Sequence, residues 1–309
     1  MKYFFFFLSA ALWAFRASAQ SKIDSFRMAQ DVKITIDRPL KMKKRPTLLI
    51  LYALPNGNTT EQTMGKKMQP TDDWHYDIQH IKAQTNFLRK KLARQNVVVV
   101  YLENNYRSWP LWKRQHSDYK QTIPHIVDTI FHLFDQPAKT LYLNGHSGGG
   151  SFIFGYLESV SAIPAAIGRI GFLDSNYGYD SSYYPKLRSW LQANQTARLT
   201  VFAYNDSVAL YQGKPVVSEK GGTWYRSHLM MQHLSQDFGL ENTRNDSLIF
   251  FESRDKKLGF FLKQNPGRAI FHTQQVERNG FIHSILYGTK KENEGYEYFA
   301  KRAYSAFIE

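Results

Sequence analysis

The sequence predicts an α/β fold in which helices cover both faces of a mostly parallel, doubly wound sheet. Continuous apolar runs at residues 47–53 and 97–102 are typical of strands that are buried on both faces. Each run is followed by a segment with helical spacing of its apolar residues, at 72–94 and 119–134. Because short connections between alternating strands and helices give right-handed crossovers, we expect the strands to be parallel.

The start of the chain is expected to be a secretory signal peptide. Residues 1–19 combine a basic start, a short apolar stretch and an Ala-x-Ala sequence that ends at Ala19. The apolar stretch is short for a membrane-spanning helix, which needs about 20 residues. We therefore expect a secreted or periplasmic protein without stable membrane insertion after cleavage, with residues 20–309 folded as one domain.

The composition indicates a globular protein and gives no sign of nucleic-acid binding. With 309 residues, of which 43% are hydrophobic, the chain is long enough for one sizeable core. It has no cysteine, so disulfides do not contribute to its stability. The net charge of +14 suits anionic envelope polymers or acidic substrates. The basic residues are scattered and form no nucleic-acid-binding motif, so no nucleic-acid partner is expected.

The other elements extend the same alternation. Residues 32–37 alternate in the manner of an edge strand. Further along we expect, in order, a strand at 169–174, a helix at 185–194, a strand at 199–204, an insertion at about 207–265, a last strand at 268–276 and a closing helix at 296–308. The insertion is too long for one crossover helix, and we interpret it as part lid and part substrate wall over the carboxyl edge of the sheet.

A glycine-bounded serine lies at the centre of this arrangement. Residues 141–144 form an apolar strand, Gly145 and Gly149 flank Ser147 at two positions on either side, and a helix-like run follows at 152–158. This is the G-x-S-x-G pattern between a strand and a helix, which holds a serine hydroxyl at the tip of a sheet. The amino end of the helix favours negative charge that develops there, so Ser147 is the predicted nucleophile.

A serine nucleophile needs a base within hydrogen-bond reach and an acid that orients the base. In the fold in which this serine motif is typical, the serine is followed in the chain by the acid and then by the histidine. His283 lies just after the predicted last strand, where this order places the base. The other histidines precede Ser147, adjoin it, or lie in the insertion or inside a predicted strand, as His272 does.

Two aspartates are candidates for the acid. Asp206 follows the strand at 199–204, the commonest position for this role, and is the preferred assignment. Asp174 ends the strand at 169–174 and is the alternative. Either carboxylate at the tip of a strand could instead cap the helix that follows.

An oxyanion hole is expected beside Ser147. One donor is the backbone N–H of Gly148, which follows the nucleophile. The second is expected near Leu54 to Asn56, in the loop after the strand at 47–53, where a Pro-Asn-Gly turn can aim an N–H inward. Removal of one such donor typically costs about 3–4 kcal/mol of barrier.

At these residues the chain resembles the α/β-hydrolase superfamily, in the Gly145–Gly149 motif and in the position of His283. The resemblance covers residues 47–283 in element order. It implies an eight-stranded, mostly parallel sheet with the triad at its carboxyl edge. One departure is that the His-Gly-rich oxyanion motif of the family is replaced by residues 54–57. Esterases, lipases and peptidases share this fold, so the resemblance does not identify the substrate.

The leading functional hypothesis is a carboxylic-ester hydrolase that forms an acyl-enzyme on a small-molecule or oligomeric ester. Aromatic and basic residues in the predicted active-edge loops would suit a sugar or aryl ester: Arg107, Trp109, Trp224, Tyr225 and Arg226. The alternatives are a serine peptidase or amidase that acts on peptides or envelope material, and a non-catalytic binding protein of the same fold.

No cofactor or metal is expected. Asp72 and Asp73 with His75 are better interpreted as the start of a helix than as metal ligands.

Overall fold

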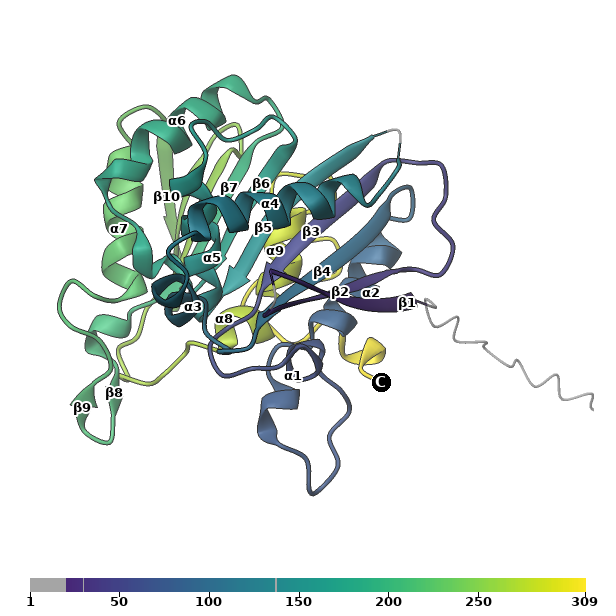
Figure 1. Cartoon of the computed structure of the whole chain (residues 1–309). Helices are drawn as coiled ribbons and strands as arrows, with labels where there is room; N and C mark the ends of the chain where they lie inside the picture. Colours follow the sequence, from purple (N-terminus) through teal and green to yellow (C-terminus); the bar gives the residue numbers. More distant parts are fainter. Residues whose placement is uncertain (1–20, 30, 137) are drawn as a thin grey trace, which may run out of the picture.

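The structure is a computed structural model that describes residues 21–29, 31–136 and 138–309 (Figure 1). The expected signal peptide at 1–19 lies outside these residues. Ten strands form the main sheet in the order β1-β2-β4-β3-β5-β6-β7-β12-β11-β10. Their bounds are β1 Ser21–Met28, β2 Val32–Pro39, β3 Thr47–Ala53, β4 Asn96–Asn104, β5 Lys139–His146, β6 Ile167–Leu173, β7 Arg198–Tyr204, β10 Leu240–Arg244, β11 Leu248–Ser253 and β12 Leu258–Lys263.

The predicted mostly parallel sheet is confirmed, but it has ten strands where the family resemblance implied eight. Strands β4, β3, β5, β6, β7 and β12 run parallel to their neighbours. Antiparallel pairs flank them, β1–β2–β4 on one side and β12–β11–β10 on the other. Every residue of β3 is buried, as its continuous apolar run predicts.

Helices cover both faces of the sheet (Figure 1). One face packs against α3 (Trp109–Gln115), α4 (Tyr119–His132), α5 (Gly150–Ser159), α6 (Tyr184–Ala193) and α7 (Thr223–Leu234). The other face packs against α2 (Ile81–Lys91), α8 (Gln274–Glu277) and α9 (Gly280–Leu286), and the short helix α1 (Thr60–Met64) follows the end of β3.

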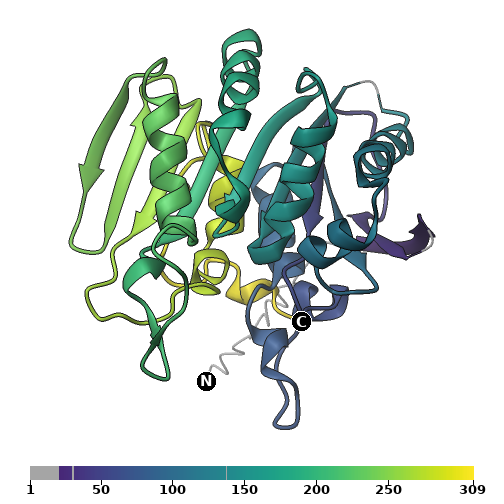
Figure 2. The same ribbon diagram turned by 60° about the vertical axis from the view of Figure 1, so that its left-hand side comes forward.

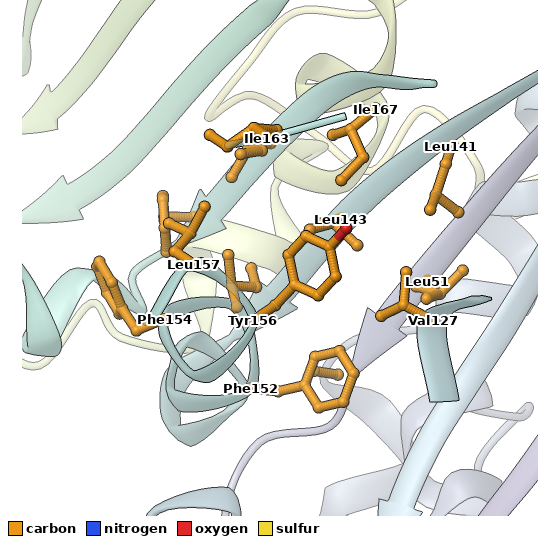
Figure 3. Close-up of a cluster of buried hydrophobic side chains, with 14 of the residues drawn as sticks. Leu51, Val127, Leu141, Leu143, Phe152, Phe154, Tyr156, Leu157, Ile163 and Ile167 are labelled. Atoms are coloured by element: carbon orange, nitrogen blue, oxygen red, sulfur yellow. The ribbon is translucent and has the colours of Figure 1, made fainter. Parts of the chain in front are cut away.

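Helix α5 is anchored to the sheet by its own apolar side chains. Figure 3 shows Phe152, Tyr156 and Leu157 of α5 in one group of buried side chains with Leu51 and Leu143 of the strands. These side chains are almost completely buried in one continuous cluster. Burial of a large apolar side chain contributes about 1.5–3 kcal/mol, so this contact holds the start of α5 firmly at the end of β5.

The last parallel strand differs from the prediction. Residues 268–276 do not form it, because the chain there is irregular and then enters α8. The strand is β12, which is buried at every position between β7 and β11. The expected insertion at 207–265 is therefore not one unit, since its second half completes the main sheet. The part that leaves the sheet is the hairpin β8 (Leu210–Tyr211) and β9 (Lys214–Pro215) with α7, and the hairpin projects in Figure 2.

Two predicted helices are also shorter. The segment at 72–94 divides into a 3-10 turn at Trp74–Asp77 and α2, because His80 before α2 has a left-handed φ of 47°. Residues 296–308 are irregular apart from a 3-10 turn at Ser305–Phe307. The side-chain amide of Asn279 donates to two carbonyl groups of this segment and fixes its irregular path. Throughout the described part of the chain, each helix is too short or too polar to span a bilayer.

Candidate active site

Ser147 lies in a sharp turn between β5 and α5. Its φ of 53° is left-handed, which is strained for a serine and is typical of functional turns. A 3-10 turn at Ser147–Gly149 leads into α5. A Cβ atom on Gly149 would lie 2.1 Å from the carbonyl oxygen of Ala53 in β3, so only glycine fits. The predicted strand–turn–helix context of Ser147 is therefore present.

Ser147 opens onto a cavity of about 450 Å³. The cavity extends along one side of α5 and is bounded by α3 and by the loop after β6. The residues that line it are Asn56, Pro110, Lys113, Ser147, Gly148, Ser151, Phe154, Glu158, Ser175, Tyr177, Gly178 and Tyr183. Its volume falls within the range of small-molecule sites.

His272 and Asp174 form a pair beside this turn. Asp174 follows β6 with a left-handed φ of 45°, and its Oδ2 lies 2.5 Å from the Nδ1 atom of His272. His272 lies in the irregular segment after β12. Its ring centroid is 4.6 Å from that of His146, the residue before Ser147. A carboxylate at Nδ1 leaves Nε2 as the ring nitrogen available to a neighbouring hydroxyl.

His146 holds the backbone of His272. The Nε2 atom of His146 lies 3.3 Å from the carbonyl oxygen of His272. Burial lowers the pKa of His146 well below its usual range, and the neighbouring His272 lowers it further. His146 is therefore neutral, and its Nε2–H donates to this carbonyl. The residue inside the serine motif thus positions the segment that carries His272.

Asp206 has a different set of contacts. Its Oδ2 accepts the backbone N–H of Thr223 at 2.7 Å and its Oδ1 accepts that of Trp224 at 3.3 Å, so it caps the start of α7. The hydroxyl of Thr223 lies between the two acids and donates to Oδ1 of Asp174. Burial, followed by the charge of Asp174, raises the pKa of Asp206 to about 6. Of the two candidate acids, Asp174 is the one whose carboxylate contacts a histidine.

The structure does not bring His283 to Ser147, which corrects the predicted position of the base. His283 lies within α9, is 3% exposed, and packs in the core on the sheet face opposite α5. Its ring is 4.5 Å from that of Phe261, and its Nδ1 lies 3.1 Å from the hydroxyl of Tyr296. Burial lowers the pKa of His283 to about 3, so it is an uncharged core residue.

The loop after β3 contributes one of the two predicted oxyanion positions to the cavity. The N–H of Leu54 donates to the carbonyl of Leu102 at 3.2 Å, so Leu54 is not a free donor. Asn56 does line the cavity. A Cβ atom on Gly148 would lie 1.9 Å from Oδ1 of Asn56, so the Asn56 side chain rests directly against the Gly148 backbone.

The five predicted substrate-binding residues lie away from this cavity. Trp109 is in the core, and its Nε1–H donates to the backbone carbonyl of Leu102. Arg107 is exposed, and its backbone carbonyl accepts the N–H of Gly57. Trp224 lines a different cavity, and Arg226 lies over the Tyr225 ring and donates to Tyr179. None of these five residues is among those that line the Ser147 cavity.

A second cavity, of about 450 Å³, lies on the His272 side. Residues of the β8–β9 hairpin, including Tyr211 and Lys214, line it together with Tyr204 and His272. Tyr177 lines both cavities and therefore lies between them. The predicted strand at 268–276 includes His272, and for that reason the sequence does not indicate this side of the site. The apolar run of β12 was the available signal, since a strand at 258–263 puts His272 in the loop that follows.

Within residues 21–29, 31–136 and 138–309, no group of three or more His, Cys, Asp or Glu side chains could hold a metal ion. Asp73 caps a 3-10 turn and accepts the backbone N–H of His75 at 3.0 Å. Asp73 thus caps a 3-10 turn, and the helix that is predicted to begin here starts only at Ile81.

Neither a protein-family model nor a curated protein matches this sequence. Among solved structures, the chain is similar to a protein called FAE, with 11% identity, a TM-score of 0.50, and coverage of 91% of this chain and 93% of that one. It is similar to a mutant feruloyl esterase module from Clostridium thermocellum, with 10% identity, a TM-score of 0.49, and 91% and 92% coverage.

An uncharacterised protein from Capnocytophaga ochracea shows 11% identity and a TM-score of 0.46, over 87% of this chain. This chain covers 65% of that protein's length. At such identities the likeness concerns the fold.

Proposed function

We propose that this chain, which has the α/β-hydrolase fold, is a serine hydrolase that cleaves a carboxylic ester through an acyl-enzyme. The observation that carries the proposal is the Asp174–His272 pair beside the strained Ser147 turn. A serine in such a turn, with an acid-oriented imidazole next to it, is the arrangement that nucleophilic catalysis requires.

The proposed base is His272 and the proposed acid is Asp174. Asp174 holds the Nδ1–H of His272 and thereby fixes the tautomer in which Nε2 is unprotonated. His272 Nε2 takes the proton of the Ser147 hydroxyl as Oγ attacks the acyl carbon. The same proton passes to the leaving alcohol oxygen, and water, activated by His272, then releases the acid and regenerates Ser147.

The proposed oxyanion hole consists of the Gly148 N–H and a donor from Asn56. Both residues line the cavity at Ser147, and the side chain of Asn56 lies against Gly148. Donors fixed at this position stabilise the tetrahedral intermediate more than the substrate, which lowers the barrier. Residues 1–19 stay a predicted signal peptide, so we propose that the enzyme acts outside the cytoplasm.

The decisive experiment combines a fluorophosphonate probe with ester turnover. The wild type is expected to be labelled at Ser147 and to hydrolyse p-nitrophenyl acetate, and Ser147→Ala is expected to lose both. Asp174→Asn is expected to lower kcat by about 10⁴, because it leaves the imidazole in the wrong tautomer. An unlabelled wild type would favour a non-catalytic binding protein. Faster turnover of aminoacyl-p-nitroanilides than of esters would favour a peptidase.

A further inference from the structure

We propose that the cavity along α5 binds the acyl part of the substrate, and that Lys113 at its far end recognises a neutral hydrogen-bond acceptor on that acyl group. The inference rests on the proposed function and extends it to a substrate class. The class is an ester whose acyl group has an apolar body and a distal hydroxyl or carbonyl.

The two cavities divide the substrate between them. The leaving alcohol receives its proton from the base, so its oxygen must lie against His272 and the alcohol must extend into the His272 cavity. The acyl carbon is bonded to Ser147 and its oxygen lies at the oxyanion donors. The acyl group therefore extends into the other cavity, which Ser147 and Gly148 line.

The acyl cavity follows the axis of α5. Ser147, Ser151, Phe154 and Glu158 line it at intervals of four, three and four residues, which is one face of a helix. At a rise of 1.5 Å per residue, the distance along the axis from Ser147 to Glu158 is about 16 Å. Phe154 contributes an aromatic ring part of the way along this path. The body of a bound acyl group is thus in contact with apolar surface.

The far end of this cavity is a polar cluster built around Glu158. Its Oε1 accepts the Tyr183 hydroxyl and its Oε2 accepts the Tyr119 hydroxyl, both at 2.6 Å. Lys113 Nζ lies 3.2 Å and 3.1 Å from the same two oxygens. Although burial opposes it, these hydrogen bonds lower the pKa of Glu158, so the group is ionised. A carboxylate accepts about four hydrogen bonds, so Glu158 is saturated.

Lys113 can offer a hydrogen-bond donor to a ligand. An ammonium group carries three N–H donors, of which two serve the Glu158 oxygens, and Nζ also lies 4.8 Å from the centroid of the Tyr119 ring. Its aliphatic stem passes over Gly155, where a Cβ atom would lie 3.3 Å from Cδ of Lys113. Because the pair of Lys113 and Glu158 has no net charge, a neutral acceptor is favoured there. A carboxylate would meet the repulsion of Glu158.

The test uses p-nitrophenyl esters of straight-chain acids with six, eight and ten carbons, each with and without a terminal hydroxyl. The wild type is expected to prefer the hydroxylated ester of one length by about tenfold in kcat/KM. Lys113→Met removes the ammonium and keeps the stem, and it is expected to abolish this preference. Lys113→Leu provides a second neutral variant, and Lys113→Arg is expected to restore part of the preference.

Lys120→Met is the matched control. Lys120 is exposed and its Nζ also lies over the Tyr119 ring, 5.9 Å from the ring centroid, but Lys120 does not line the cavity. This variant is expected to keep the wild-type preference.

The inference is overturned if the wild type cleaves the acetate ester yet shows no hydroxyl preference at any length. It is also overturned if both neutral Lys113 variants keep the preference. Failure of the proposed function looks different, because the wild type would then neither be labelled nor cleave the acetate ester.

Discussion

His272 and His283 are close in the sequence, yet the structure places them in unlike environments. His272 contacts the carboxylate of Asp174 next to the serine turn, whereas His283 is enclosed by the aromatic rings of Phe261 and Tyr298 in the core. A base must exchange a proton with the nucleophile. His272 packs against His146, the residue before Ser147, whereas His283 lies in α9 on the opposite face of the sheet. The two histidines therefore provide a matched pair of test variants.

The first prediction compares His272→Gln with His283→Gln. Loss of the base is expected to lower kcat of His272→Gln by about 10³–10⁴ or more and to slow fluorophosphonate labelling of Ser147 in proportion. His283→Gln keeps a polar group near Tyr296 and is expected to retain labelling, with a lower Tm. Labelling rates and melting curves of both variants check this. The assignment of His272 is contradicted if His283→Gln is the unlabelled variant.

The second prediction concerns the Asn56 side chain. If its amide donates to the oxyanion, Asn56→Ala is expected to lower kcat by about 10²–10³ while KM changes little. The reason is that the contact with Asn56 forms fully only in the transition state. Steady-state kinetics on p-nitrophenyl acetate measure this. An unchanged kcat would assign the donation to the backbone N–H of residue 56 instead.

The third prediction follows from the raised pKa of Asp206, about 6 against 3.8 in the unfolded chain. Because the pKa of Asp206 is raised in the folded state, protonation of this carboxyl group stabilises the fold. The stabilisation is complete below about pH 4 and is lost as the pH rises through 6. The difference corresponds to about 3 kcal/mol. The Tm of the wild type is therefore expected to fall relative to that of Asp206→Asn as the pH rises from 4 to 7. Melting curves across this range check it, and parallel pH profiles for the two proteins would contradict it.

The fourth prediction tests the serine turn. Gly149→Ala would place Cβ 2.1 Å from the Ala53 carbonyl oxygen, so the backbone must move. We expect Tm to fall by roughly 3–10 °C and labelling of Ser147 to be lost. Gly239→Ala is the control, because its Cβ meets nothing within 4 Å. Equal behaviour of the two variants would show that the close approach at residue 149 is not needed.

The parallel core of the sheet and the serine turn could be predicted because local sequence determines them. The continuous apolar run of β3 requires burial on both faces. The glycine spacing around Ser147 is dictated by the contact of Gly149 with β3. Both signals lie within a few residues of the feature that they predict.

The histidine partner could not be predicted in the same way, because it depends on which of two segments joins the sheet. Residues 258–263 and 268–276 both contain apolar positions. The first segment is buried between β7 and β11. The second segment lies outside the sheet, where His272 contacts Asp174. Pairing with distant strands determines which of the two segments joins the sheet. Because the first one does, His272 is the histidine that follows the last parallel strand. The contacts of the acid could not be predicted from local sequence either. Asp206 follows its strand as predicted, but its carboxylate caps α7.

Tyr177 lines both cavities and lies between them, so on the proposed mechanism each cavity holds one of the two products. On the proposed mechanism, the alcohol leaves first from the His272 side, while the acyl group is still attached to Ser147. The next molecule to enter that side meets the same imidazole, so a second alcohol competes there with water. At high alcohol concentration the protein would therefore exchange one ester for another, a transesterification that proceeds without release of the free acid.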